Sequence, residues 1–367
     1  MNNVKNIGLY LHIPFCRSKC PYCDFYSMRA DESVKAQYVK VLKSRIAAEM
    51  ADSRCKADTL YIGGGTPSVI EAQKLIEIVK STSPFLTDNA EITVECNPYG
   101  LTSNFFKELA NSGVNRISMG LQSAVDNERK ALGRLSNAEN VKNAVISAQN
   151  AGIGNISLDV MLGIPRQTEK TLSETLDFCL SLGIPHISTY ILKLEEGTLF
   201  YKNQKSLSLP DDDTVAEMYL RTCETLENNG IMQYEISNFA MPDFQSRHNL
   251  KYWNCEEYLG LGPAAHSFID GKRFYFERDL KAFLSGAKPV PDGTGGDFTE
   301  YAMLRLRLSE GLLNSETEKR FGHKIPDEMI KKSAIFIKGG FMESDVLGLR
   351  LTKKGFLLSN SILAEIL

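Results

Sequence analysis

The chain has 367 residues, of which 43% are hydrophobic and 24% are charged, and its formal net charge at pH 7 is -3. This composition is typical of a globular protein with room for one large domain and a smaller one. Neither the composition nor the slightly acidic charge calls for nucleic acid or an anionic membrane surface as a partner.

The N-terminus and the cysteines indicate the compartment. Residues 1–11 lack the basic and apolar segments of a secretory signal, and no run approaches the ~20 apolar residues of a membrane span. We therefore expect a cytoplasmic protein, in which thiols stay reduced. Of the eight cysteines, five are scattered, and we expect each to be a small buried hydrophobic residue: Cys55, Cys96, Cys179, Cys223 and Cys255.

Strands alternate with amphipathic helices through residues 1–230, which we interpret as the core domain. The expected strands cover 7–13, 57–63, 90–96, 114–120, 155–163 and 185–192, and the expected helices cover 32–50, 71–82, 102–113, part of 120–151, 168–183 and 212–230. Six such βα units predict an α/β fold with a parallel sheet wrapped by helices. Right-handed crossovers would curl this sheet into a partial (β/α)6 barrel of the TIM type.

The rest of the chain follows a different pattern. Residues 231–297 are interpreted as a connecting segment, in which the Pro/Gly-rich stretch 286–297 is a linker. Residues 298–367 combine short helices, a hairpin and a final helix, which predicts a small winged-helix-like domain. This region has eleven Lys and Arg against nine Asp and Glu, so it lacks the concentrated basic surface of a nucleic-acid module.

Polar residues follow successive expected strands. The glycine-rich stretch 63–67 follows the second strand, Glu95 ends the third, Gln122 follows the fourth, and Asp159 lies within the fifth. The carboxyl ends of parallel strands share one edge, where such folds carry their sites. Taken singly, a glycine run is more often a turn, whereas a carboxylate in an apolar strand such as Asp159 needs a partner.

Three cysteines are crowded into one loop after the first strand. Cys16, Cys20 and Cys23 have the spacing Cys-x3-Cys-x2-Cys. Zinc usually takes four ligands, but no second cysteine pair exists, and His12, which could complete a zinc site, lies in an expected strand. Three thiolates suit a [4Fe-4S] cluster with one iron left without a protein ligand.

This spacing, together with the glycine-rich stretch after the second strand, resembles the radical S-adenosylmethionine (SAM) superfamily. The resemblance implies that the open iron binds SAM and that one electron from the cluster cleaves it to a 5′-deoxyadenosyl radical. Across nearly the whole chain the sequence is similar to the oxygen-independent coproporphyrinogen III oxidase group, through YLHIPFCRSKCPYCDF (10–25), YIGGGTPS (61–68), VECNP (94–98), RISMGLQS (116–123), LGR (132–134) and LDVMLGIP (158–165).

By position, the resemblance implies roles for individual residues. The cysteines at 16, 20 and 23 would hold the cluster. The residues expected to line the SAM pocket are Tyr10, Tyr22, Gly64, Gly65, Thr66, Glu95, Gln122, Arg134 and Asp159.

Three features separate the chain from the oxidases. Phe25 stands where the oxidases carry a fourth cysteine, and only fifteen residues precede Cys16, whereas the oxidases have a longer N-terminal segment. The stretch His248-Asn249-x-x-Tyr252-Trp253 matches the HNxxYW motif of the HemW branch, a group of haem chaperones that resembles the oxidases. The resemblance therefore implies haem as cargo and haem-accepting proteins, including membrane-bound respiratory enzymes, as partners.

A histidine can ligate haem iron, and aromatic rings can lie against a porphyrin face. We therefore expect His248, Asn249, Tyr252 and Trp253 to contact haem, although a hydrogen-bonded histidine beside packed aromatic rings is the alternative. His266 and Cys255 are further candidates for the axial ligand.

Two functions stay open at this point. One is a haem chaperone without oxidase activity; the other is a coproporphyrinogen III oxidase that decarboxylates two propionate side chains. The sequence does not decide whether SAM is cleaved, nor whether the protein forms a cluster-dependent homodimer.

Overall fold

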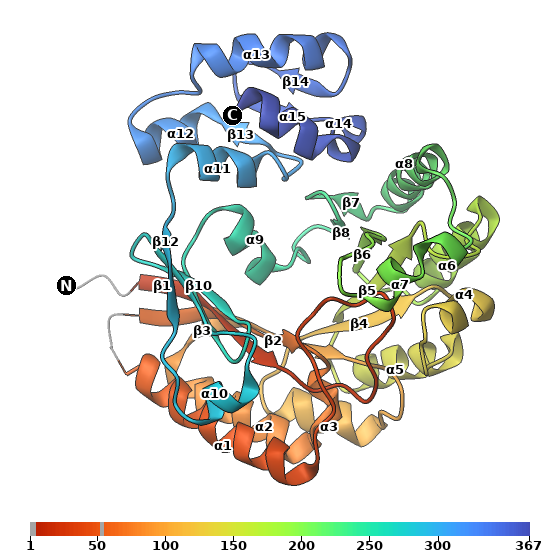
Figure 1. Cartoon of the computed structure of the whole chain (residues 1–367), viewed down its shortest axis with the longest axis vertical. Helices are drawn as coiled ribbons and strands as arrows, with labels where there is room; N and C mark the ends of the chain where they lie inside the picture. Colours follow the sequence, from red (N-terminus) through yellow and green to blue (C-terminus); the bar gives the residue numbers. More distant parts are fainter. Residues whose placement is uncertain (1–4, 52–54) are drawn as a thin grey trace.

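The fold is built on six parallel strands that curl into a partial barrel. A computed structural model describes residues 5–51 and 55–367 (Figure 1). The six strands are β1 (Lys5–Ile13), β2 (Cys55–Gly64), β3 (Leu86–Cys96), β4 (Arg116–Gln122), β5 (Asn155–Leu162) and β6 (His186–Ile191), and they lie side by side in chain order. Each pairs in parallel with the next, as the six βα units predict.

Helices cover the outer face of this sheet (Figure 1). They are α1 (Glu32–Glu49), α2 (Ala72–Thr82), α3 (Ser103–Asn111), α5 (Ala138–Asn150), α6 (Glu169–Ser181) and α8 (Asp212–Asn228), with the shorter α4 (Asp126–Ala131) and α7 (Leu199–Lys202) and the single 3₁₀ turns Pro67–Val69, Ser83–Phe85 and Gln204–Ser206. Side-chain caps define several starts: Asp31 accepts from the backbone N–H of Val34 at α1, and Thr168 from that of Thr171 at α6.

The two faces of the sheet differ in polarity because side chains alternate along each strand. In β2, Leu60 and Ile62 are fully buried in the hydrophobic core. The alternate residues Thr59 and Tyr61 lie on the inner side, where their hydroxyls contact other polar side chains. The barrel interior is therefore a polar chamber rather than a second apolar core.

Residues 231–297 extend the sheet at both edges, which the sequence analysis did not predict. Beyond β6 lie β8 (Asn238–Ala240) and β7 (Met232–Gln233); beyond β1 lie β9 (Tyr258–Leu261), β10 (His266–Ile269), β11 (Lys272–Tyr275) and β12 (Val290–Thr294), and α9 (Arg247–Trp253) and α10 (Leu280–Leu284) lie between them in the chain. The stretch interpreted as a linker thus contains β12. Its Pro291 is tolerated because β12 is the edge strand, where a missing N–H costs no internal hydrogen bond.

The last 70 residues form a small unit of helices around a three-stranded sheet. It contains α11 (Phe298–Arg305), β13 (Leu312–Leu313), α12 (Asn314–Phe321), α13 (Asp327–Lys338), β14 (Met342–Ser344), β15 (Gly348–Leu351), α14 (Lys353–Leu357) and α15 (Ser359–Ile366). The sequence predicts the helices and the hairpin of β14 and β15, and β13 adds a third strand. Backbone hydrogen bonds join this unit to the segment after β7: Ile236 N–H donates to Arg307 and Ser309 N–H to Tyr234.

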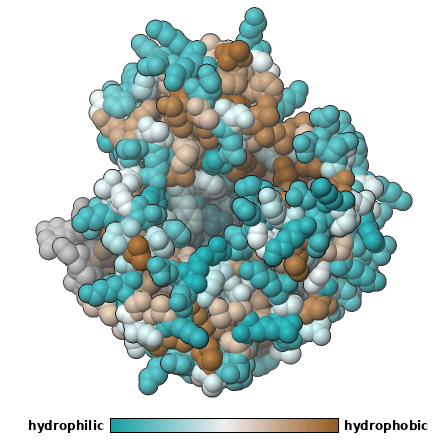
Figure 2. Space-filling model, viewed as in Figure 1, coloured by the Kyte–Doolittle hydropathy of each residue, from teal (hydrophilic) through white to brown (hydrophobic). Residues whose placement is uncertain are grey.

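The face of the molecule drawn in Figure 2 mixes polar and hydrophobic residues. In Figure 2, hydrophobic residues form scattered patches, and the face is hollowed near its centre, beneath the C-terminal helices. Within residues 5–51 and 55–367, every helix is too short or too polar to cross a bilayer.

Candidate functional site

The cysteine loop leaves β1 at the carboxyl edge of the sheet and faces a large cavity. The cavity has a volume of about 690 Å³, and Cys16, Cys20 and Cys23 all line it. The loop is held at its base, where Cys16 N–H donates to Met28 and Met28 N–H to Pro14. Its tip is a turn in which Cys23 N–H donates to the carbonyl of Cys20 over 3.1 Å. All three thiols are partly buried and none is in a disulfide.

Polar groups surround these sulfurs. The Thr66 hydroxyl lies 3.4 Å from Cys16 Sγ, and Arg134 Nη1 lies 4.0 Å from Cys20 Sγ. In the part of the chain that is described, no three Cys, His, Asp or Glu side chains converge as ligands of a single metal ion. A [4Fe-4S] cluster makes a different demand, because each thiolate binds its own iron.

The glycine stretch after β2 packs directly against the cysteine loop. Gly65 N–H donates to Ile13 and Thr66 N–H donates to Phe15, each over 2.8 Å. Gly64 has φ +113°, and a Cβ there would lie 2.7 Å from the His12 ring; a Cβ at Gly65 would lie 2.7 Å from the Phe15 carbonyl oxygen. Only glycine allows this close approach, which brings the end of β2 beside the end of β1.

Two partly buried carboxylates line the cavity from β3 and β5. Glu95 accepts hydrogen bonds from the Tyr61 hydroxyl at 2.8 Å and from Gly64 N–H at 3.2 Å, and Asp159 accepts one from the Ser118 hydroxyl at 3.3 Å. Burial raises the pKa of Glu95 to about 7 and that of Asp159 to about 6. Desolvation opposes the charged form of each, and the hydrogen bonds only partly restore it.

Gln122, Arg134 and Tyr22 complete the wall next to the cysteines. Arg134 Nη2 donates to the carbonyl of Gly120 over 2.7 Å, and Gln122 adopts φ +69° at the end of β4. Burial raises the pKa of the Tyr22 hydroxyl. The structure therefore brings together the three cysteines and eight of the nine residues expected to line the SAM pocket.

Tyr10, the ninth, does not line the cavity. Its hydroxyl lies 3.0 Å from His12 Nδ1, and its ring lies 6.2 Å from that of Tyr61. His12 uses its other nitrogen, Nε2, to donate to the Tyr26 carbonyl over 2.9 Å, and burial lowers its pKa to about 4. Both residues belong to an aromatic layer next to the cavity.

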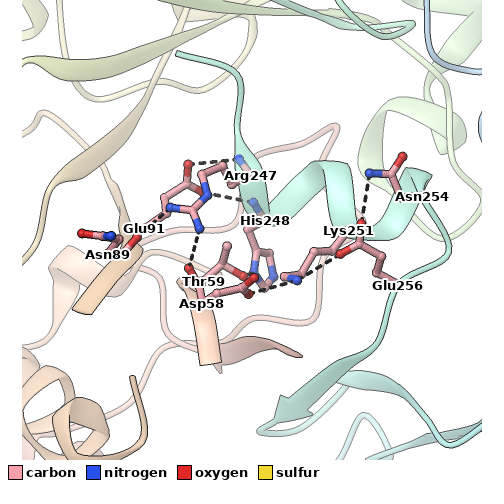
Figure 3. A network of polar contacts seen from close by, with 9 residues as sticks. All are labelled: Asp58, Thr59, Asn89, Glu91, Arg247, His248, Lys251, Asn254 and Glu256. Carbon is pink, nitrogen blue, oxygen red and sulfur yellow. Dashed lines mark hydrogen bonds and ion pairs between the residues drawn. The ribbon is translucent and has the colours of Figure 1, made fainter. Parts of the chain in front are cut away.

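The HNxxYW motif lies on α9, whose first turn is anchored on β2 and β3 (Figure 3). The backbone N–H groups of Arg247 and His248 each donate a hydrogen bond of 3.0 Å to the Glu91 carboxylate. Lys251 forms an ion pair with Asp58 at 3.0 Å. The helix is thereby fixed inside the partial barrel.

His248 itself is fully buried, and both of its ring nitrogens are engaged. Nδ1 lies 2.8 Å from the Thr59 hydroxyl and Nε2 lies 2.7 Å from the Tyr252 hydroxyl, while the ring stacks on Tyr61 at 5.2 Å. Burial lowers the pKa of His248 to about 3, so it stays neutral. In this arrangement neither nitrogen is free to coordinate iron. The motif reaches the cavity through Asn249, which lines its wall.

The remaining haem candidates lie elsewhere. Trp253 is half-buried at the end of α9, Cys255 is buried, and His266 is exposed and stacks on Tyr275 at 5.2 Å. Of the other scattered cysteines, Cys96, Cys179 and Cys223 are buried as expected, whereas Cys55 is only partly buried.

Sequence reasoning missed several residues that line the cavity. These are Tyr61, Arg116, Ser118, Ser188 and Tyr190. The signal that could have found them is the two-residue alternation of each strand: they occupy the positions between the apolar residues that face the helices.

Comparisons with known proteins agree with this geometry. The family model for the radical SAM superfamily matches residues 10–179. The heme chaperone HemW of Lactococcus lactis subsp. lactis (strain IL1403) is 33% identical, with 98% of this chain and 96% of that protein covered. The heme chaperones HemW of Bacillus subtilis (strain 168) and Haemophilus influenzae (strain ATCC 51907 / DSM 11121 / KW20 / Rd) are 32% and 34% identical, covering 98% and 99% of this chain and 98% of each relative.

Among solved structures, coproporphyrinogen III oxidase (HemN) from Escherichia coli, a radical SAM enzyme, superposes with a TM-score of 0.85 and 22% identity, covering 100% of this chain and 91% of that chain. This likeness establishes the fold and confirms the α/β partial barrel. The matched family model and the near-full-length relatives together show that the chain belongs to the radical SAM superfamily and, within it, to the HemW family.

Proposed function

We propose that this protein is a haem chaperone that holds a [4Fe-4S] cluster, binds SAM beside it and delivers haem to acceptor proteins. The observation that carries the proposal is the 32%, 33% and 34% identity, over nearly the full chain, to three bacterial proteins named heme chaperone HemW. Coverage of 98% or more means that the likeness includes the cysteine loop, the barrel and the C-terminal unit.

The cluster is assigned to Cys16, Cys20 and Cys23. Membership of the radical SAM superfamily implies this cofactor and SAM. The donor set fits the cluster, since three partly buried thiols of one loop face one cavity beside the cation of Arg134. When bound, the cluster supplies the electron chemistry and an iron for a small ligand, while the chain supplies position and charge.

SAM is assigned to the cavity wall next to the cysteine loop. The backbone at Gly64 and Gly65 leaves room for the close approach of a ligand, and Glu95 and Asp159 are acceptors for amino or hydroxyl groups. Arg134 suits a carboxylate, because its planar fork matches that group. Losing one such charge-assisted hydrogen bond costs about 1.5–3 kcal/mol of binding free energy.

The alternative is an oxygen-independent coproporphyrinogen III oxidase, which shares the fold. At 22% identity this likeness supports the architecture and not the reaction. Phe25 stands where the resemblance to the oxidases expects a fourth cysteine, and its side chain is 69% exposed on the cavity wall. We therefore propose that the protein lacks oxidase activity.

Haem-accepting proteins are the proposed partners, including membrane-bound respiratory enzymes. We place the protein in the cytoplasm, so contact with a membrane would run through such a partner. The mass of the reconstituted protein in solution decides whether it forms a cluster-dependent homodimer.

Parallel incubation with haem and with coproporphyrinogen tests the function. The protein is reconstituted anaerobically with iron and sulfide, and Cys20→Ala serves as the matched control without an intact cluster site. A haem chaperone binds haem with a stable Soret band and leaves the propionates of coproporphyrinogen intact. Formation of protoporphyrinogen in the presence of SAM and a reductant would identify an oxidase instead.

A further inference from the structure

One arginine inside the barrel is buried, and it borders the cavity. Arg116, the first residue of β4, is 2% exposed, yet its guanidinium lines the cavity. Among the residues that the structure describes, none forms a hydrogen bond or ion pair with this side chain, and its Nε is buried without an acceptor.

Arg129 shows how unusual this arrangement is. It is also 2% exposed, but it is fully engaged: its Nε donates to the Ser136 carbonyl at 2.9 Å and its Nη1 to the Ser123 carbonyl at 2.8 Å. A guanidinium stays charged at any physiological pH and carries five donors. Burial of that charge without acceptors is costly, so an unpartnered arginine facing a cavity points to a ligand that is bound there.

The nearby carboxylates attract Arg116 through space but do not contact it: its charge lowers the pKa of both Glu95 and Asp159, against the larger effect of their burial. Glu95 and Asp159 line the same cavity, but neither is within ion-pair distance of Arg116, and their oxygens accept from Tyr61 and Ser118 instead. The donors of Arg116 are therefore left for an anionic group that enters the cavity.

The shape of the donor set identifies the anion. The planar fork of arginine matches a carboxylate with two parallel hydrogen bonds. Two carboxylate ligands are in question, SAM and haem. The carboxylate of SAM is assigned to the cysteine loop, where Arg134 lies beside Cys20. Arg116 comes from the other end of β4 and reaches the inner part of the cavity.

The cavity also carries apolar side chains that suit a flat macrocycle. Met161, Leu135 and Ile191 line it, and the last two are 55% and 42% exposed. We propose that Arg116 binds a propionate carboxylate of the tetrapyrrole cargo and so orients haem inside the barrel. This inference rests on the proposed function, because it takes haem as the cargo.

The experiment compares the affinity for haem with the affinity for haem dimethyl ester. The ester keeps the iron and the ring but lacks the propionate charges, so the comparison isolates the contact to the carboxylate. Both are titrated into the reconstituted wild type, Arg116→Met and Arg116→Lys, and binding is followed at the Soret band. Arg221→Met is the matched control, because Arg221 is an exposed cation on α8 that does not line the cavity.

We expect the wild type to bind haem about ten- to a hundredfold more tightly than the ester, the effect of one charge-assisted contact. Arg116→Met should abolish this preference and leave ester affinity unchanged, which also reports that the variant is folded. Arg116→Lys should keep part of the preference, and Arg221→Met should keep all of it.

Three results would overturn the inference. One is a wild type that does not distinguish haem from its ester. Another is an Arg116→Met variant that loses affinity for both equally or keeps the preference. The third is an Arg116→Met variant that binds haem normally but binds SAM more weakly, while its affinity for decarboxylated SAM is unchanged. That result would assign Arg116 to the carboxylate of SAM. Failure of the wild type to bind either tetrapyrrole would refute the proposed function together with this inference.

Discussion

Burial of Glu95 makes the stability of the protein depend on pH. Burial raises the pKa of this carboxyl from 4.5 to about 7, and the hydrogen bonds from Tyr61 and Gly64 only partly oppose the rise. The folded protein therefore holds this proton more tightly than the unfolded chain does. Glu95 therefore stabilises the folded state most below about pH 4.5. Its contribution to the free energy of unfolding falls as the pH rises toward about 7 and is constant above that. Between these two pH limits, the free energy of unfolding that Glu95 contributes changes by about 3 kcal/mol.

Glu95→Gln removes the charge and keeps a carbonyl oxygen for both hydrogen bonds. At pH 8 we expect the variant to be more stable than the wild type by about 3 kcal/mol, and at pH 4.5 the two should be nearly equal. Urea denaturation of the metal-free proteins, followed by far-UV circular dichroism at both pH values, measures this difference. Glu196→Gln, at an exposed glutamate in the loop after β6, is the matched control. A stability difference that does not change between pH 4.5 and pH 8 would refute the reasoning.

Three further substitutions test the cavity. Cys20→Ala should abolish the iron–sulfur absorption of reconstituted protein, whereas Cys55→Ala should retain it; equal spectra would count against the cluster assignment. Gly64→Ala places a Cβ 2.7 Å from the His12 ring, so SAM affinity measured by calorimetry should fall at least roughly tenfold, and an unchanged affinity would contradict the assigned pocket. His248→Phe loses two buried hydrogen bonds, so stability should fall by about 2 kcal/mol while the Soret band of bound haem stays in place; a shifted band would make His248 the iron ligand.

The parallel strands were predictable because local patterns specify them. Alternating apolar residues such as Leu9 and Leu11 are fully buried against the outer helices, and side-chain caps mark the starts of α1, α3, α5, α6 and α8. The rule that sites lie at the carboxyl edge of such sheets correctly placed Glu95, Gln122 and Asp159 in one cavity.

The edge strands were not predictable from local patterns. β7 to β12 are two to five residues long, too short for a two-residue period to stand out. β9 lies beside β1, where Tyr258 pairs with Gly8 although the two residues are far apart in the chain. Such pairing depends on the assembled sheet and leaves no local signal.

Side-chain roles inside the barrel also depend on tertiary contacts. His248 has the chemistry of a haem ligand, but the Thr59 and Tyr252 hydroxyls engage its nitrogens once α9 docks. Arg116 is the first residue of β4, at the end opposite the carboxyl edge, and it nevertheless lines the cavity. Residue type alone could not distinguish these two outcomes.

Electron paramagnetic resonance of the reduced, anaerobically reconstituted protein, with and without SAM, tests most directly whether the cysteine loop holds a cluster with an iron open to SAM. We expect about four iron atoms per chain and a cluster signal that changes when SAM is added, but not when adenosine is added. A single bound metal ion, or a cluster signal that saturating SAM leaves unchanged, would contradict the assignment of the cavity.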